Sequence, residues 1–168
     1  MTYKEKLRNI TTFVFDFDGV LTDGTVWLMP GKEFVRSMNT RDSYAMHMAA
    51  TNHYRIAVIT GGNSEMVRER MEYLGIKDVF MKVTDKKTVL REFMEKNQLG
   101  KEEVLYMGDD LIDIAAMKLC GLSAAPADAA EEVLETVHYV SPKNGGEGCV
   151  RDVIEQTLKL QGKWKIPE

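Results

Sequence analysis

The sequence has few of the residues that mark disulfide-rich, zinc-binding or multidomain proteins. It contains two cysteines, Cys120 and Cys149, and neither has a second cysteine or a histidine at metal-ligand spacing. Such cysteines predict neither a disulfide framework nor a zinc site, and we interpret both as core thiols. With four prolines and no Pro/Ser-rich linker, nothing divides the chain into separate domains.

Long hydrophobic runs and blocks of like charge are also missing. No apolar run reaches the roughly 18 residues of a candidate membrane helix, and the N-terminal stretch MTYKEKLRNITTF meets charge too early for a signal peptide. The net charge of −4, without clustered Lys and Arg, argues against a nucleic-acid or anionic membrane surface. We therefore expect a cytoplasmic protein whose partner is a small molecule.

What is present favours one well-filled core. The 168 residues, 44% of them hydrophobic, suffice for a single domain over residues 1–168 and are too few for two. Short apolar runs predict strands at 12–15, 56–59, 79–81, 104–107, 122–124 and 139–140, and segments of helical period predict helices at 43–52, 64–74, 86–97, 111–119, 129–136 and 149–160. This alternation predicts an α/β fold, a Rossmann-like parallel sheet with helices on both faces.

One segment departs from the alternation. Residues 25–37 hold two extended runs around Met29-Pro30-Gly31-Lys32, where the order of Pro and Gly fits a type II turn. We expect a small projecting β-hairpin here and a C-terminal tail at 161–168. No segment is long enough to form an inserted cap domain.

Two aspartates follow the first predicted strand, in the stretch FVFDFDGVLTDG. Because side chains alternate along a strand, Asp16 and Asp18 should point to the same side and Phe17 to the other. Gly19 then allows a tight backbone turn beside a ligand. In a parallel sheet this side is the ligand crevice at the carboxyl ends of the strands.

Other predicted strands end in residues of matching chemistry. They are Thr60-Gly61-Gly62, Asp85-Lys86 and Gly108-Asp109-Asp110, with Asp113 three residues later. Converging acids would repel one another unless a cation neutralised them, and ligands that are all oxygens favour Mg²⁺. Asp110 and Asp113 have an alternative role, because either could simply cap the helix that begins there.

A metal, a lysine and a threonine hydroxyl around one point suit a phosphoryl group. Asp16 could attack phosphorus and form an aspartyl-phosphate, with Asp18 as the general acid and then the general base. Thr60 and Lys86 would bind the phosphoryl oxygens, and Mg²⁺ on Asp16 and Asp109 would stabilise the transition state.

In order and spacing, DFDGVLTDG, the Thr60-Gly61 turn, Lys86 and GDDLID resemble the four motifs of the haloacid dehalogenase superfamily of phosphatases. The resemblance implies Asp16 as nucleophile and Asp18 as acid/base. It also implies Mg²⁺ held by the Asp16 carboxylate, the Asp18 carbonyl and Asp109.

More narrowly, FDGVLTDG, the hairpin, NTRDSYAM, VITGGN, GDDLIDIAAM and NGGEGCVRDVIE resemble the capless subfamily that hydrolyses 3-deoxy-D-manno-octulosonate 8-phosphate for lipopolysaccharide precursors. This resemblance implies a homotetramer in which a neighbour's hairpin or tail completes the active site, and burial there of Trp27, Phe34, Trp164 and Ile166. The alternative is that these side chains fold back on their own domain. Position by position, the resemblance implies that substrate meets Asp18, Asn39, Thr40, Arg41, Asp42, Ser43, His47, Gly62, Arg70 and Lys86.

Several alternatives stay open at the level of sequence. The loop reads RDS where many relatives have RDG, and Gly62 stands where some relatives place an arginine, so a nine-carbon ulosonate 9-phosphate is an alternative substrate. For Arg70 the alternative is surface pairing along its helix, and for His47 it is packing. A non-catalytic tetramerising module and a phospho-receiver are the competing functions, and the retained Asp16, Asp18, Lys86 and Asp109 argue against the first.

Overall fold

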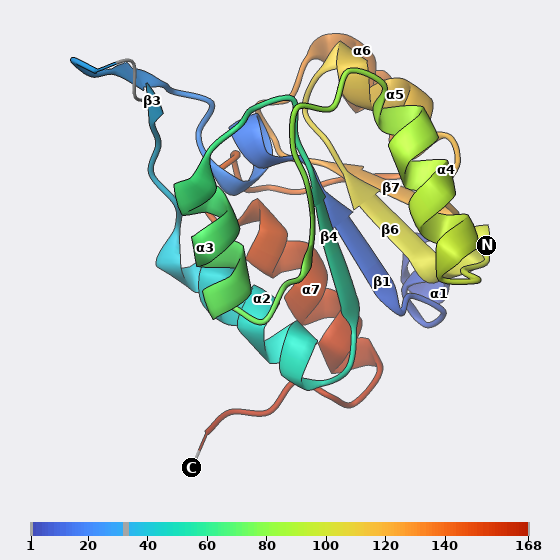
Figure 1. Ribbon diagram of the computed structural model, residues 1–168. Helices are drawn as coiled ribbons and strands as arrows, with labels where there is room; N and C mark the ends of the chain where they lie inside the picture. Colours follow the sequence, from blue (N-terminus) through green and yellow to red (C-terminus); the bar gives the residue numbers. More distant parts are fainter. Residues whose placement is uncertain (1, 32–33, 168) are drawn as a thin grey trace.

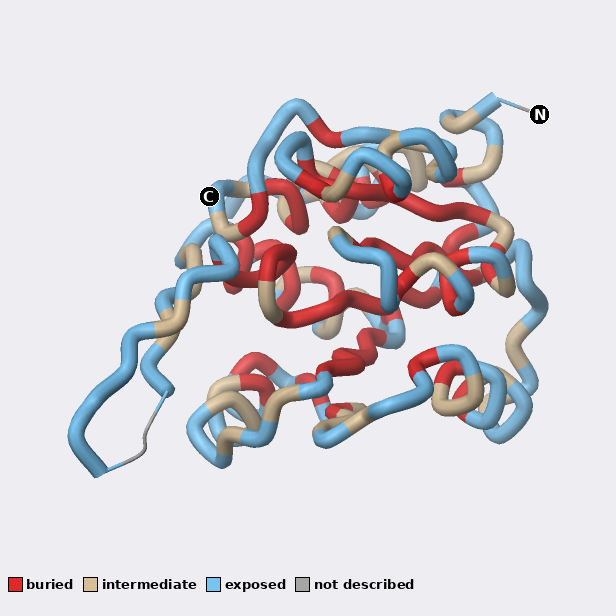
Figure 2. The backbone as a smooth tube through the Cα atoms, turned by 90° about the horizontal axis from the view of Figure 1, so that it is seen from above, coloured by how far each residue is buried: buried red, intermediate tan, exposed pale blue. Residues whose placement is uncertain are grey.

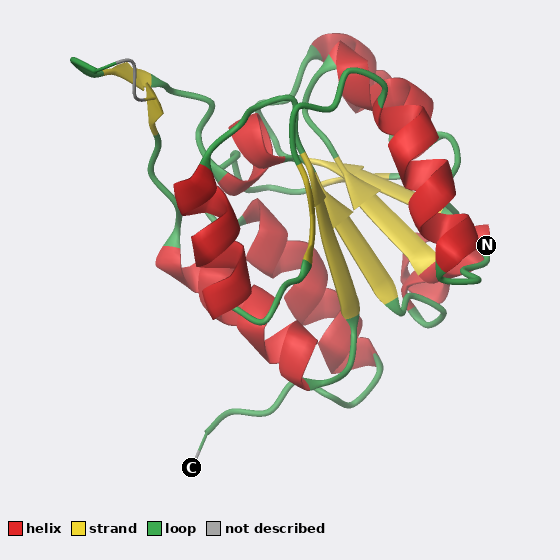
Figure 3. Cartoon of the chain, in the orientation of Figure 1, coloured by secondary structure: helices red, strands yellow, loops and turns green. Residues whose placement is uncertain are grey.

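A computed structural model describes residues 2–31 and 34–167 and shows a parallel sheet between two layers of helices (Figures 1 and 3). The strand order is β5-β4-β1-β6-β7-β8, and every neighbouring pair is parallel. The strands are β1 (Thr12–Phe15), β4 (Arg55–Ile59), β5 (Asp78–Phe80), β6 (Val104–Met107), β7 (Leu122–Ala125) and β8 (Tyr139–Val140). The predicted α/β fold is confirmed.

The strands are apolar on both faces because each face has its own hydrophobic core. Phe13 and Phe15 of β1 enter one cluster of buried side chains, whereas Val14 enters the other. Ala57 and Val58 of β4 divide in the same way. Figure 2 shows this buried backbone in the middle of the molecule, inside a mostly exposed outer layer.

The helices supply the outer walls of these two clusters. Side chains of α1 (Tyr3–Leu7), α2 (Thr40–Thr51), α3 (Glu65–Tyr73) and α7 (Cys149–Leu160) join the first, and those of α4 (Lys86–Lys96), α5 (Leu111–Met117) and α6 (Glu131–Thr136) join the second. The predicted helices are present. The bounds of α7 match the prediction, whereas α2 begins three residues before its predicted start. Within residues 2–31 and 34–167, no helix combines the length and hydropathy needed to cross a bilayer.

Helix α1 was not predicted, because its five residues are too few to show helical periodicity. The residues that begin this helix can nevertheless be recognised in the sequence. The Thr2 hydroxyl accepts from the Glu5 backbone N–H, and the Glu5 carboxylate accepts from the Thr2 N–H, which together form a capping box.

The predicted hairpin is present as β2 (Trp27–Leu28) and β3 (Phe34–Val35), paired antiparallel and projecting from the body (Figure 1). Gly31 has φ +92°, as the third position of the predicted type II turn requires, while Lys32 of that turn lies outside the described residues. Trp27 and Phe34 are exposed. In the tail, Trp164 folds back on its own chain beneath the Arg151 guanidinium, whereas Ile166 is 84% exposed.

Asp42 joins the two helices that cover one face of the sheet. It lies in the first turn of α2 and is fully buried, and its Oδ1 accepts from the backbone N–H of Arg151 in α7 at 2.7 Å. The N-cap residue of α7 is Gly148, which has no side chain to cap the helix, so Asp42 supplies the missing acceptor. Burial raises the pKa of Asp42 to about 6, against the lowering effect of the backbone hydrogen bonds from Arg151 and Gly148.

This shift in the pKa of Asp42 predicts that the unfolding free energy depends on pH. Because its folded pKa of about 6 exceeds the ordinary value of 3.8, the stabilising contribution of Asp42 is complete below that ordinary value and is lost as pH rises through about 6. Relative to Asp42→Asn, the wild type should therefore lose about 1–3 kcal/mol of unfolding free energy between about pH 4 and pH 7. Urea unfolding of both proteins across this range measures the difference, and parallel stability curves would contradict the prediction.

Candidate active site

The predicted site residues meet at the carboxyl ends of β1, β4 and β6. Asp16 follows β1, Thr60 follows β4 and Asp109 lies just beyond β6. Between β1 and β6 the chain order of the strands reverses, because β4 and β5 lie on one side of β1 and β6, β7 and β8 on the other. Such a switch point is where open parallel sheets bind ligands.

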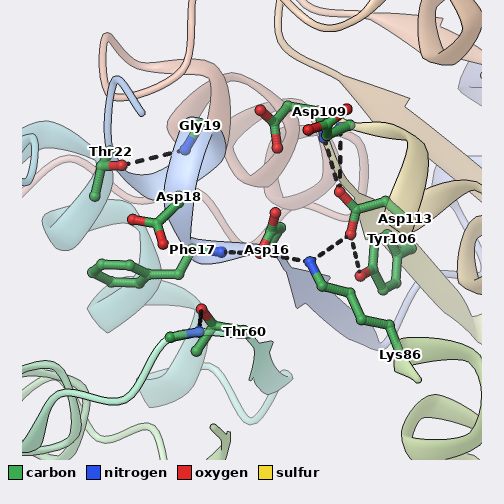
Figure 4. A network of polar contacts seen from close by, with 12 residues as sticks. Asp16, Phe17, Asp18, Gly19, Thr22, Thr60, Lys86, Tyr106, Asp109 and Asp113 are labelled. Carbon is green, nitrogen blue, oxygen red and sulfur yellow. Dashed lines mark hydrogen bonds and ion pairs between the residues drawn. The ribbon is translucent and has the colours of Figure 1, made fainter. Parts of the chain in front are cut away.

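Lys86 lies at the centre of the site, between two carboxylates. Its Nζ is 2.8 Å from Asp16 Oδ1 and 2.8 Å from Asp113 Oδ1, and all three side chains are buried. The Tyr106 hydroxyl donates to the same Asp113 oxygen at 2.8 Å (Figure 4). Burial opposes the charged lysine, but Asp16 and Asp113 outweigh it and raise the Lys86 pKa, so this group is a permanent cation.

The carboxylates around Lys86 outnumber its single charge. Oxygens of Asp16, Asp109 and Asp113 lie within 4.8 Å of one another. Burial and the charge of Asp113 raise the pKa of Asp16 to about 8, although Lys86 opposes this, and burial and Asp113 raise the pKa of Asp109 to about 6. Three carboxylates against one ammonium leave an excess of two negative charges, which a divalent cation would balance.

Asp16 and Asp109 fit such a cation better than Asp113 does. Asp109 Oδ1 is buried without a hydrogen-bond partner among the described residues. Asp113 is already satisfied, because Oδ1 accepts from Lys86 and Tyr106 and Oδ2 accepts from the backbone N–H groups of Asp109 and Asp110. Asp113 therefore orients Lys86 and the Asp109 loop, while Asp110 caps α5 through the Leu111 N–H.

Asp18 lies beside this cluster and is paired with Arg36. This arginine belongs to the segment 34–38 that leads from β3 back to the body, called the hairpin arm below. Arg36 Nε donates to Asp18 Oδ1 at 2.6 Å, and Nη2 is 3.4 Å from Oδ2. Thr60 Oγ1 accepts from the Gly62 N–H at 3.1 Å, which leaves the Thr60 O–H free to donate to an anion. Phe17 between the two aspartates is buried in the core and also lines the pocket that holds Asp18.

Two glycines hold the backbone against the site. A Cβ at Gly19, which has φ +86°, would lie 1.9 Å from Asp109 Oδ2. A Cβ at Gly145 would lie 1.8 Å from the Gly19 carbonyl oxygen. The NGGEG loop is therefore packed directly on the turn that carries Asp18, and no larger residue fits either position.

The residues that the resemblance assigned to substrate are less closely gathered. Asn39 caps α2 by accepting from the N–H groups of Arg41 and Asp42, and Ser43 is buried and donates to the Asn39 carbonyl. Thr40 and Arg41 are exposed at the same helix end, and Asp42 faces α7. His47 is exposed, with Nδ1 3.3 Å from the Leu74 carbonyl oxygen. The guanidinium carbon of Arg70 lies 5.4 Å from the centre of the Tyr73 ring. Substrate contacts of these residues stay predictions.

Two functional residues were not found from the sequence. Arg36 is in the hairpin, 18 positions from Asp18, and no local spacing relates the two. Tyr106 reads as one more apolar residue of β6, although its position seven residues before Asp113 puts both at one strand end. A strand tyrosine just before a GDD loop is the only signal that could have indicated it.

Comparison with known proteins agrees with this geometry. Residues 72–154 match the family model of haloacid dehalogenase-like hydrolases. A 3-deoxy-D-manno-octulosonate 8-phosphate phosphatase of Escherichia coli K12 is 37% identical over 158 residues, covering 94% of this chain and 84% of that protein.

Two solved structures extend the comparison. The phosphatase of the same name from Yersinia pestis has a TM-score of 0.93 and 35% identity, covering 95% of this chain and 86% of that one. The one from Moraxella catarrhalis, in complex with a magnesium ion, a phosphate ion and a molecule of the free sugar acid KDO, has a TM-score of 0.91 and 30% identity, covering 95% and 91%. The chain therefore belongs to the haloacid dehalogenase-like hydrolases, in the branch that contains the 3-deoxy-D-manno-octulosonate 8-phosphate phosphatases.

Proposed function

We propose that this protein is a Mg²⁺-dependent phosphomonoesterase that hydrolyses 3-deoxy-D-manno-octulosonate 8-phosphate to the free sugar acid and phosphate. The observation that carries the proposal is the meeting of the buried Asp16 and Lys86 with the half-buried Asp109, which has the charge and oxygen ligands for a divalent ion beside a phosphoryl group. The E. coli relative and the Moraxella structure with magnesium, phosphate and KDO support the metal and the substrate.

The carboxylates of Asp16 and Asp109 would hold Mg²⁺, with the Asp18 backbone carbonyl as the further ligand that the resemblance implies. When bound, the ion supplies charge neutralisation and polarises a phosphoryl oxygen. Asp113 stays outside this set because its four hydrogen bonds already occupy both oxygens.

The chain's own residues divide the remaining work. Asp16 attacks phosphorus and becomes an aspartyl-phosphate, while Asp18 donates a proton to the leaving alcohol oxygen. Asp18 then takes a proton from the water that hydrolyses this intermediate, which releases phosphate and regenerates the Asp16 carboxylate. Lys86 and the free Thr60 hydroxyl bind the phosphoryl oxygens and hold phosphorus in line with the nucleophile.

We also propose a homotetramer in which a neighbour's hairpin or tail approaches this site. The hairpin supports this, because Trp27 is 64% exposed, Leu28 78% and Phe34 58%, a cluster of large apolar side chains that is costly in water. Trp164 is excluded from this surface because it packs on its own chain, so Ile166 is the apolar side chain that the tail offers.

The proposed ligand set predicts that Asp109 and Asp113 contribute differently to Mg²⁺ affinity. Asp109→Ala should weaken Mg²⁺ binding at least about 100-fold, because it removes a direct ligand. Asp113→Asn should weaken it less, by about 10-fold, because only the support of Lys86 and the Asp109 loop is altered. Isothermal titration of the two folded variants with Mg²⁺ measures this, and an equal loss in both would assign Asp113 as a ligand.

The mechanism predicts different defects at Asp16 and Asp18. Asp16→Asn should abolish turnover, and Asp18→Asn should lower kcat by about 10²–10⁴-fold while Mg²⁺ still binds. Phosphate release from eight- and nine-carbon ulosonate phosphates measures both the defect and the preferred substrate. No turnover above the Asp16→Asn background with any of these esters would reject the proposed function, and higher efficiency with a nine-carbon ester would correct the substrate.

The tetramer predicts an effect of the exposed hairpin. Leu28→Glu should shift the protein to a smaller species in size-exclusion chromatography with light scattering, because a charge replaces buried apolar surface. Activity should fall with assembly. Tyr73→Ser, which alters an equally exposed apolar residue outside the hairpin, is the matched control. A Leu28→Glu protein of unchanged mass and activity would contradict the proposal.

A further inference from the structure

A groove runs between the hairpin arm and α3 and reaches Phe17, in the turn after β1 that carries Asp18. Its volume is about 270 Å³, and it is lined by Phe17, Phe34, Val35, Arg36, Met38, Ser64, Met66, Val67 and Arg70. Arg36 and Phe17 also line the small pocket that holds Asp18, Thr60 and Gly62. The groove is therefore continuous with the end of the site where Asp18 acts.

The lining of this groove carries positive charge and no acid of its own. Its two charged residues are Arg36 and Arg70, and the rest of the lining is apolar except for Ser64. Among the described residues, Arg36 has one ion pair, to Asp18, and Arg70 has none. An apolar groove with two arginines in a protein of net charge −4 is suited to an organic anion.

Arg36 still has donors for such an anion while it holds Asp18. Its contacts are Nε to Asp18 Oδ1 at 2.6 Å, Nη2 to Asp18 Oδ2 at 3.4 Å and Nη1 to the Phe34 carbonyl at 3.2 Å. Each terminal nitrogen carries a second N–H, so one N–H on Nη1 and one on Nη2 are unused. The remaining N–H groups on the terminal nitrogens can therefore donate to a carboxylate.

Gly62 leaves the space that the Arg36 guanidinium occupies. A Cβ on Gly62 would lie 3.5 Å from Arg36 Nη2, 3.5 Å from Thr60 Oγ1 and 3.8 Å from Asp18 Oδ2. These are ordinary contacts for a methyl group, but a longer side chain at 62 would take the same place as Arg36. An arginine at position 36 or one at position 62 could therefore place its guanidinium at the same point, beside Asp18 and Thr60.

That point lies on the leaving-group side of the site. In the proposed reaction Asp18 protonates the leaving oxygen, so a guanidinium bonded to Asp18 faces the sugar, whereas Lys86 and Thr60 face the phosphoryl group. We infer that Arg36 binds the carboxylate of the sugar-acid leaving group in the groove between the hairpin arm and α3, and so selects acidic sugar phosphates over neutral ones. This inference rests on the proposed function and assigns the recognition of its substrate.

The test compares two primary phosphate esters, 3-deoxy-D-manno-octulosonate 8-phosphate and D-arabinose 5-phosphate, which has no carboxylate. Arg36→Met should lower kcat/KM for the sugar acid about 10- to 100-fold, mainly through KM, and change that for the pentose less than about 3-fold. Arg36→Lys should recover part of the loss, because it keeps the charge but not the paired N–H groups. Arg68→Met is the matched control, because this half-exposed arginine of α3 does not line the groove, and it should leave both substrates unaffected.

The double variant Arg36→Met/Gly62→Arg separates binding from a purely structural role. Returning a guanidinium from position 62 should restore most of the preference for the sugar acid. Equal losses of kcat for both esters would show that Arg36 only positions Asp18, and unchanged selectivity would show that it binds no substrate; either result overturns the inference and leaves the proposed function standing. A wild type that hydrolyses neither ester overturns both.

Discussion

A buried ammonium between two carboxylates, Lys86 with Asp16 and Asp113, is the interaction on which the rest of the site depends. An ion pair that is fully desolvated tolerates no missing partner, because removing one charge leaves another buried and unpaired. Asp16, the proposed nucleophile, is itself one of the partners. Its position is set by its contact with Lys86, the residue proposed to bind the phosphoryl group, so the proposed chemistry and the local packing cannot be altered independently.

The negative excess around Lys86 means that this arrangement could hold a metal ion in addition to its ion pairs. Asp113 is held by four donors, and two of these are backbone N–H groups of the Asp109-Asp110 turn. Asp109 is thereby fixed close to Asp16 with one oxygen lacking a partner. Carboxyl groups in this relation, one buried and one half-buried, resist ionising together without a cation, and the turn at Gly19 lets the two strand ends approach closely enough to share one.

How much of this could be read from the sequence differs between parts of the chain. Apolar runs such as 104–107 gave strands with the correct ends, because strands buried on both faces leave a continuous pattern. Asp16, Lys86 and Asp109 could be assembled because strand ends of a parallel sheet must converge. Helix ends were less certain, since Asn39 caps α2 by a contact that periodicity does not encode. Asp42 shows the same limit, because its partner in α7 is 109 positions away and depends on how two helices cross.

Arg36 shows most clearly what the sequence does not predict. Its position beside Asp18 depends on how the two strands of the hairpin pair, which no local pattern indicates. Its ion pair with Asp18 is not an efficient means of stabilising the fold. The Asp18 side chain is 35% exposed and the Arg36 side chain 13%, and partly solvated pairs contribute about 0–1 kcal/mol. The effect of the pair is geometric, because it ties Asp18, the proposed acid/base, to the hairpin arm. In the proposed mechanism the sheet therefore fixes the nucleophile and the metal ligands, while the acid and the leaving-group contact share one guanidinium. Under this proposal, recognition of the sugar would change through the hairpin without disturbing the buried charges that bind and attack the phosphoryl group.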